Sequence, residues 1–185
     1  MSTTFPGTTI EALSIEKGSS KLLFDGIFAA GGITLSQVSV MTGLEPYLIQ
    51  NWVKRGFVAS PVKRLYSKEQ FARIVIINML REALQIERIC KLIHVIGGVL
   101  DDTSDDLISD DELYHRYVDM VSDTGINVSD KASVLNAAQA AADGFEDDAP
   151  QARKKLVRIL QVMLYAHNAS RLRHTAEEIL LTLGD

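Results

Sequence analysis

The stretch from Thr34 to Arg55 constrains the fold of this chain more than any other part of the sequence. Two short segments with helical spacing of apolar residues flank Thr42-Gly43-Leu44, and glycine gives such a turn the backbone freedom that it needs. Thr34 is placed to cap the first helix, and Pro46 suits the first position of the second. The stretch therefore predicts two helices joined by a tight turn, the pattern of a helix-turn-helix.

The second of these helices has one apolar and one polar face. Its spacing places Trp52 among the apolar residues, so we expect this side chain in the core rather than against a nucleic-acid base. For Gln50 and Asn51, base contact and simple solvent exposure both remain open. The polar face carries residue types that read base edges or hold phosphates in a major groove, namely Tyr47, Gln50, Asn51, Lys54 and Arg55.

The charge of the chain is unevenly distributed. Between Ile33 and Lys91 there are nine basic and four acidic residues, a local charge of +5, whereas the whole chain has a net charge of −5. Such asymmetry says more about partners than the total does, and it favours double-stranded DNA as the partner of the basic segment.

A short extended segment from Pro61 to Tyr66 follows the two helices. Its adjacent cations, Lys63 and Arg64, could be ordinary solvated charges, but beside a DNA-reading helix they predict phosphate contacts, with Tyr66 at the same surface. The run Ser67-Lys68-Glu69-Gln70 has the form of a capping box and opens a long apolar helix.

In these motifs the chain resembles the MerR superfamily of winged-helix regulators. Those proteins have, in order, a Thr-Gly turn, a recognition helix, a Gly-Leu/Ile exit, a wing that ends in Tyr, and a pair of helices. The wing and the apolar helix after it are also similar to a bacterial family catalogued as domain of unknown function 1836, itself similar to MerR. The matching runs, between about Ile33 and Ile96, are Thr42-Gly43-Leu44, Gly56-Phe57-Val58, Tyr66-Ser67-Lys68-Glu69-Gln70 and Leu84-Gln85-Ile86-Glu87-Arg88-Ile89.

The resemblance implies a winged helix-turn-helix module that binds DNA. The chain departs from MerR regulators at Gln50-Asn51-Trp52-Val53, where their recognition helices usually carry Arg-Tyr-Tyr-Glu, and its wing is shorter. Several short helical patterns also replace the single long coiled-coil helix of those proteins. The operator geometry, effectors and metals of MerR regulators are therefore not carried over to this chain.

The whole chain is expected to be mainly α-helical, with two subdomains. In the C-terminal part we expect helices near Ser109, after Ser129, from about 150 to 167 and from about 170 to 183. The predicted organisation is a loose N-terminal arm over 1–18, the DNA-binding module with a preceding helix over 19–96, an acidic linker over 97–108, and an all-helical dimerisation or regulatory subdomain over 109–185.

The C-terminal part contains one apolar stripe at helical spacing. It could form a homodimer interface or pack inside the subunit, and the sequence leaves both open. A pocket for an unknown effector or protein partner is expected between the 150–168 and 170–183 helices, and the acidic linker could compete with DNA for the basic module. The stripe consists of Leu156, Ile159, Leu160, Met163 and Leu164.

Catalytic and metal sites have no clear signature in the sequence. The four histidines are scattered, and the single cysteine, Cys90, excludes an internal disulfide framework. The run from Asp101 to Glu112 has the spacing of a calcium-binding EF-hand loop, but Asp106 occupies the position that requires glycine, so a solvated acidic linker is preferred. We therefore expect no enzymatic activity, cofactor or metal.

No apolar stretch is long enough to cross a membrane, and the first residues lack a secretory signal, so a cytoplasmic location is expected. The sequence as a whole predicts a sequence-specific DNA-binding transcriptional regulator. The alternative is a protein–protein adaptor in which the helix-turn-helix is only structural.

Overall fold

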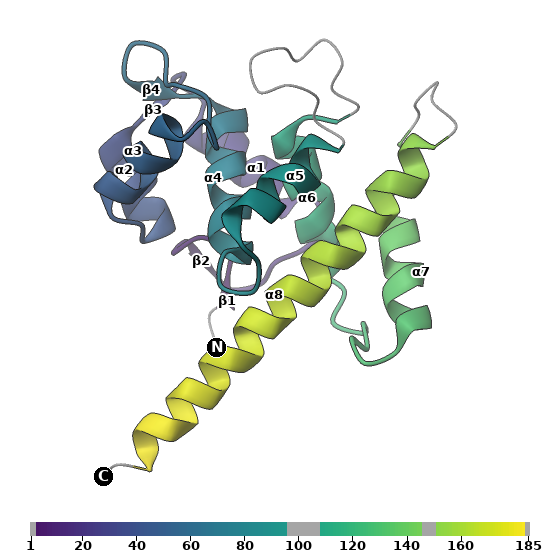
Figure 1. The fold of residues 1–185 in the computed structure, drawn as a ribbon. Coiled ribbons are helices and arrows are strands. Elements are labelled where there is room, and N and C mark those ends of the chain that lie inside the picture. Colours follow the sequence, from purple (N-terminus) through teal and green to yellow (C-terminus); the bar gives the residue numbers. More distant parts are fainter. Residues whose placement is uncertain (1–2, 96–107, 146–150, 184–185) are drawn as a thin grey trace.

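The computed structural model describes residues 3–95, 108–145 and 151–183 (Figure 1). The described part is mainly α-helical, as the sequence predicts. The helices are α1 (Ser19–Ile27), α2 (Leu35–Thr42), α3 (Pro46–Lys54), α4 (Lys68–Leu80), α5 (Ile86–His94), α6 (Asp110–Val121), α7 (Lys131–Ala141) and α8 (Ala152–Thr182), and the strands are β1 (Thr3–Thr4), β2 (Glu11–Ala12), β3 (Ile33–Thr34) and β4 (Leu65–Tyr66). Most of the predicted acidic linker lies outside the described residues.

Helix α4 is the centre of the fold. From Phe71 to Leu80 every residue is buried except Asn78, which is half-buried. A helix that is apolar on nearly all sides must be surrounded by other elements, and α4 contacts α2, α5, α6 and α8. Ser67 caps its first turn together with Gln70, as the sequence predicts.

A buried ion pair joins α4 to α6. The Arg73 guanidinium donates from Nε to Asp110 Oδ2 at 2.6 Å and from Nη2 to Oδ1 at 3.2 Å. The side chains are only 8% and 12% exposed, so water does little to screen the two charges. Burial raises the pKa of Asp110, and the guanidinium opposes this shift.

Within the predicted loose arm over 1–18, residues 3–12 form a hairpin that packs on the rest of the fold, so the arm is not loose over these residues. Strands β1 and β2 pair in an antiparallel register, and Phe5 is only 5% exposed. The Tyr114 hydroxyl donates to the Pro6 carbonyl at 2.9 Å. The Asn78 side-chain amide donates at 3.0 Å both to the Gly7 carbonyl and to the Thr42 carbonyl at the end of α2. The arm is held by these contacts with distant residues, which its local sequence does not show.

One continuous helix, α8, replaces the two helices that were expected over 150–167 and 170–183. Asn168 and Ser170 lie between or at the edge of the two expected helices, and both side chains bond to carbonyls one turn earlier, those of Leu164 and Ala166. Such bonds let polar residues remain inside a helix. The pocket expected between two separate helices therefore does not exist.

The predicted dimerisation stripe on this helix faces the interior of the single chain. Its members are at most 3% exposed and belong to the same hydrophobic cluster as α4 and α6. The sequence left open whether the stripe was internal or intermolecular, and the structure assigns it to the core. The five residues are Leu156, Ile159, Leu160, Met163 and Leu164.

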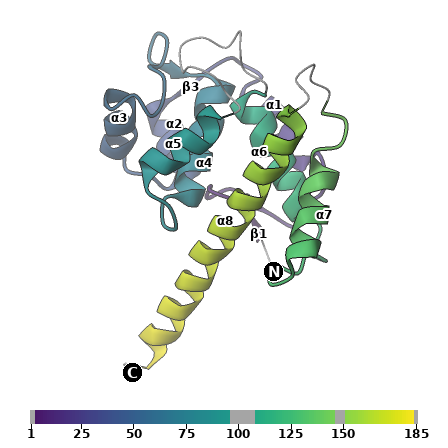
Figure 2. The same ribbon diagram turned by 45° about the vertical axis from the view of Figure 1, so that its right-hand side comes forward.

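The two predicted subdomains share one hydrophobic core. Helix α6 lies against α1 and α4, and α8 lies against α4, α6 and α7. Figures 1 and 2 show the C-terminal half of α8 projecting beyond the rest of the molecule. Every residue from Arg171 to Leu183 is exposed. None of the helices in the described ranges has the length and apolar character needed to cross a membrane.

Replacing Arg73 by methionine should lower the free energy of unfolding by about 3–5 kcal/mol, because Asp110 would be left buried and unpaired. The double variant Arg73→Met/Asp110→Leu should recover most of this loss, since it removes both charges. Urea unfolding measures all three proteins. The matched control is Arg153→Met, which breaks an exposed pair with Asp143 and should cost less than about 1 kcal/mol. An Arg73 variant no less stable than this control would contradict the assignment.

Candidate nucleic-acid interface

Helices α2 and α3 form a compact unit around a glycine turn. Thr34 Oγ1 accepts from the Gln37 backbone N–H at 3.4 Å, and the Gln37 side chain accepts from the Thr34 N–H at 2.8 Å. This reciprocal cap starts α2 at the predicted residue. The turn depends on Gly43, whose φ of 70° lies in the left-handed region. Pro46 occupies the first turn of α3, also as predicted.

Helix α3 has a buried face and a polar exposed face. Ile49 and Trp52 are buried, at 0% and 3% exposure, so Trp52 is a core residue as expected. On the opposite face, the side chains that the sequence predicts to contact DNA are exposed to solvent. Tyr47, for example, is 70% exposed. The exposed members of this predicted set on α3 are Tyr47, Gln50, Asn51 and Lys54.

Adjacent cations form the tip of a tight hairpin, which we call the basic hairpin (Val62–Leu65). The Val62 N–H donates to the Leu65 carbonyl at 3.1 Å, and the Leu65 N–H donates back at 2.9 Å. The two residues between them, Lys63 and Arg64, have φ values of 50° and 66°. Two consecutive residues with positive φ correspond to the hairpin turn that normally prefers Asn-Gly.

The tip of the basic hairpin is strained and positively charged. Lysine and arginine have no short side chain that compensates for the left-handed backbone, and such strain is typically found at functional sites. Both tip residues are exposed. Within the described ranges, neither has a carboxylate partner within ion-pair distance. The tip therefore offers two free cations to an anionic partner.

The hairpin is fixed to the helical unit at its base. Strand β4 pairs with β3, with Thr34 opposite Leu65 and Ile33 opposite Tyr66. Gly32 allows this close approach, since a Cβ atom there would lie 2.8 Å from Leu65 Cβ. Figure 2 shows α3 and β3 at the same end of the molecule, away from α7. The cations and the polar face of α3 thus lie at one end of the fold.

Tyr66 does not belong to the exposed surface, so its assignment to DNA contact is wrong. Side chains alternate along a strand, and the pairing with β3 turns Leu65 outward and Tyr66 inward. Tyr66 is 3% exposed, and burial raises the pKa of its hydroxyl. The sequence predicts the extended segment, but it does not show which of the two residues faces the core.

Arg55 is partly occupied by contacts within the chain. Its Nη2 atom donates to Glu87 Oε1 at 2.7 Å, and its guanidinium carbon lies 4.4 Å from the centre of the Phe57 ring. Both members of the ion pair are about half exposed, so the pair is weak. Among the five predicted α3 residues, Arg55 is therefore the least available. No feature of the sequence predicts this pairing with Glu87 of α5.

Substituting the tip by Asn-Gly (Lys63→Asn/Arg64→Gly) should stabilise the chain by about 1–2 kcal/mol, because these residues adopt the left-handed backbone at lower cost. Urea denaturation measures the change. The control Lys63→Ala/Arg64→Ala removes the same charges but keeps the strain, and it should bring no such gain. Equal stability of the two variants would mean that the tip is not strained.

Comparisons with known proteins give one family match. No curated protein and no solved structure matches the chain. The resemblance to MerR regulators remains a prediction from the sequence. The matched residues extend from the end of α1 through α2, α3, the basic hairpin, α4 and α5 into α6, and so include the whole candidate interface. Residues 27–117 of the chain match the family described as Domain of unknown function (DUF1836), which is uncharacterised.

Proposed function

We propose that this protein is a sequence-specific DNA-binding transcriptional regulator with a winged helix-turn-helix. Helix α3 would enter the major groove, and the basic hairpin would act as the wing. The observation that supports this most strongly is the pair of strained cations at the hairpin tip, which have no ion-pair partner among the described residues and lie at the same end of the molecule as the exposed polar face of α3 (Figure 2). A purely structural turn would favour residues that adopt this backbone without strain.

The exposed side chains divide into two roles by their chemistry. Gln50 and Asn51 carry amides that can both donate and accept, so they suit base edges. Lys54, Lys63 and Arg64 supply positive charge without base information, so they suit phosphates. Specificity is expected to depend on the amides, and salt-dependent affinity on the cations.

Lys63→Ala/Arg64→Ala should weaken binding to all duplexes and reduce the slope of log affinity against log salt by about 2, because two phosphate contacts are lost. Gln50→Ala should instead relax discrimination by roughly 1–3 kcal/mol at one base pair. Fluorescence anisotropy on duplexes selected from a random DNA pool measures both quantities.

The matched control is Lys155→Ala/Arg158→Ala, which removes two exposed cations from α8, away from the proposed interface. It should leave the salt slope unchanged. If the control and the hairpin variant reduce affinity equally, the binding is non-specific attraction to positive charge. If the unmodified protein selects no duplex, DNA binding itself is contradicted.

A protein-binding role is the second candidate, and the surface of α2 favours it. Val40 is 72% exposed beside a hollow of about 310 Å³. An apolar hollow on a helix of the candidate interface would suit a partner protein better than DNA. Its lining residues are Ile27, Ile33, Ser36, Gln37, Val40 and Met41.

We further propose that the protein acts as a homodimer, through a face of α8 that the sequence interpretation did not consider. This face, the α8 stripe, follows a heptad spacing of alternating three and four residues, the pattern of a coiled-coil seam. It is opposite the buried stripe and is exposed along its whole length. Its members are Val162, Tyr165, Ala169, Leu172, Ala176, Ile179 and Leu183.

The α8 stripe is complementary to itself in size. In an antiparallel pair, Tyr165 would face Ala176 of the second copy, and Ala169 would face Leu172. Large residues thus meet small ones on both sides of a two-fold axis, as an interface between identical chains requires. An isolated helical end of this length is only marginally stable in water, so pairing would also stabilise it.

Leu172→Glu/Ile179→Glu should convert the dimer to a monomer, because charge would be buried in the seam. Sedimentation equilibrium at micromolar concentration measures the mass. The control is Leu13→Glu/Leu22→Glu, at leucines that are 94% and 75% exposed but lie outside the α8 stripe, and it should remain dimeric. A monomeric unmodified chain would overturn the dimer and leave the DNA proposal to its own test.

A further inference from the structure

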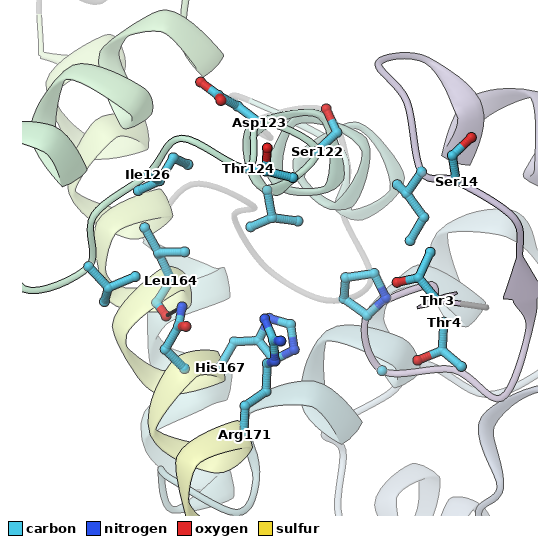
Figure 3. Close-up of a pocket in the computed structure, with 16 residues that line it drawn as sticks. Thr3, Thr4, Ser14, Ser122, Asp123, Thr124, Ile126, Leu164, His167 and Arg171 are labelled. Carbon is cyan, nitrogen blue, oxygen red and sulfur yellow. Dashed lines mark hydrogen bonds between the residues drawn. The ribbon is translucent and has the colours of Figure 1, made fainter. Parts of the chain in front are cut away.

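A cavity of about 680 Å³ lies at a distance from the candidate interface (Figure 3). Three segments surround it: the N-terminal hairpin, the end of α6 with the loop that follows, and the middle of α8. Its size is that of a site for a small organic molecule. Neither α3 nor the basic hairpin contributes to its lining.

One wall is the face of α8 that contains Leu164, His167 and Arg171. These residues are spaced three and four apart, so they line one side of the helix. Figure 3 shows the His167 and Arg171 side chains extending into the cavity. The remaining walls mix hydroxyl-bearing residues, such as Thr4 and Ser122, with an apolar group that includes Ile15 and Ile126.

His167 presents a neutral N–H donor to this cavity. The Tyr117 hydroxyl lies 2.7 Å from its Nδ1 atom, and Tyr117 is 0% exposed. Burial raises the pKa of Tyr117, so the phenol keeps its proton, and Nδ1 is the acceptor that this proton needs. The imidazole proton is therefore on Nε2. Burial, with help from Arg171, lowers the pKa of His167 to about 4, so the ring is neutral at pH 7.

Arg171 adds a positive charge next to this donor. Within the described ranges it has no carboxylate partner at ion-pair distance. The acidic residue of the lining, Asp123, accepts from the Gly125 N–H at 2.9 Å. Figure 3 shows its carboxylate at the far edge of the cavity from Arg171. The interior thus combines an apolar patch around Ile15 and Ile126 with two donors at one end, one of them charged.

We infer that this cavity binds a small organic carboxylate, with the carboxylate on Arg171 and His167 Nε2 and an apolar body against Ile15 and Ile126. A guanidinium and a neighbouring N–H match the two oxygens of a carboxylate. A neutral apolar molecule would leave the Arg171 guanidinium without an anionic partner. An inorganic anion would leave the space next to Ile15 and Ile126 empty. This site is separate from the proposed DNA-binding surface.

Isothermal titration calorimetry of the full chain at pH 7 tests the inference without DNA, so the result does not depend on the proposed function. Sodium octanoate is the probe. Octanol, which has the same apolar body without the charge, and inorganic phosphate, which has a charge without an apolar body, are the comparison ligands. We expect octanoate to bind about tenfold or more tightly than either, since a charge-assisted hydrogen bond contributes at least this factor.

Arg171→Gln should weaken octanoate binding by about tenfold or more, whereas Arg158→Gln on the same helix should not change it. Arg171 is exposed, so its variant should keep the melting temperature of the unmodified chain. Ile126→Trp, which narrows the cavity from the opposite wall, should also weaken binding. Absence of octanoate binding, equal binding of octanol or phosphate, or full affinity in Arg171→Gln would each overturn the assignment.

Discussion

The buried pair between Arg73 and Asp110 is the constraint on which the arrangement of the chain depends. Charges that are nearly free of water must be paired, so α4 and α6 can pack only in the register that brings these two groups together. The pair thereby connects the segment that carries α2, α3 and the basic hairpin to the one that carries α7 and α8. A hydrophobic contact alone would tolerate sliding of one helix along the other, whereas a two-point hydrogen-bonded pair does not.

In contrast to the ion pair, the basic hairpin has a local conformation that lowers the stability of the fold. Two cations with left-handed backbone persist only where their surroundings impose it. Strand pairing at Ile33 and the Gln70 amide, which donates to the Ser60 carbonyl at 3.0 Å, supply that support from outside the turn. The stable core formed by α4 thus holds a strained, exposed turn in place.

The sequence predicts well those features that are set by neighbours within one helical turn. The caps at Thr34 and Ser67 and the turn at Gly43 each depend on residues three or four positions apart, and all three are confirmed. The predictions failed where contacts between residues far apart in the sequence determine the conformation. The side chain of Tyr66 faces inward because its strand pairs with β3. The N-terminal hairpin is ordered because Phe5 is buried in the core. In α8, the side chains of Asn168 and Ser170 bond to the helix backbone, so one helix continues where the sequence predicted two.

The side chain of Asn78 gives the N-terminal hairpin an unexpected link to α2. One amide group donates separately to the Gly7 carbonyl and to the Thr42 carbonyl, so a movement of this side chain away from its position on α4 would release both segments. Thr9 strengthens the link, since its hydroxyl donates to the Val40 carbonyl at 2.7 Å. The hairpin and the end of α2 should therefore open as one cooperative unit in native-state hydrogen exchange. Fluctuations that begin at the chain terminus would then reach the turn that orients α3.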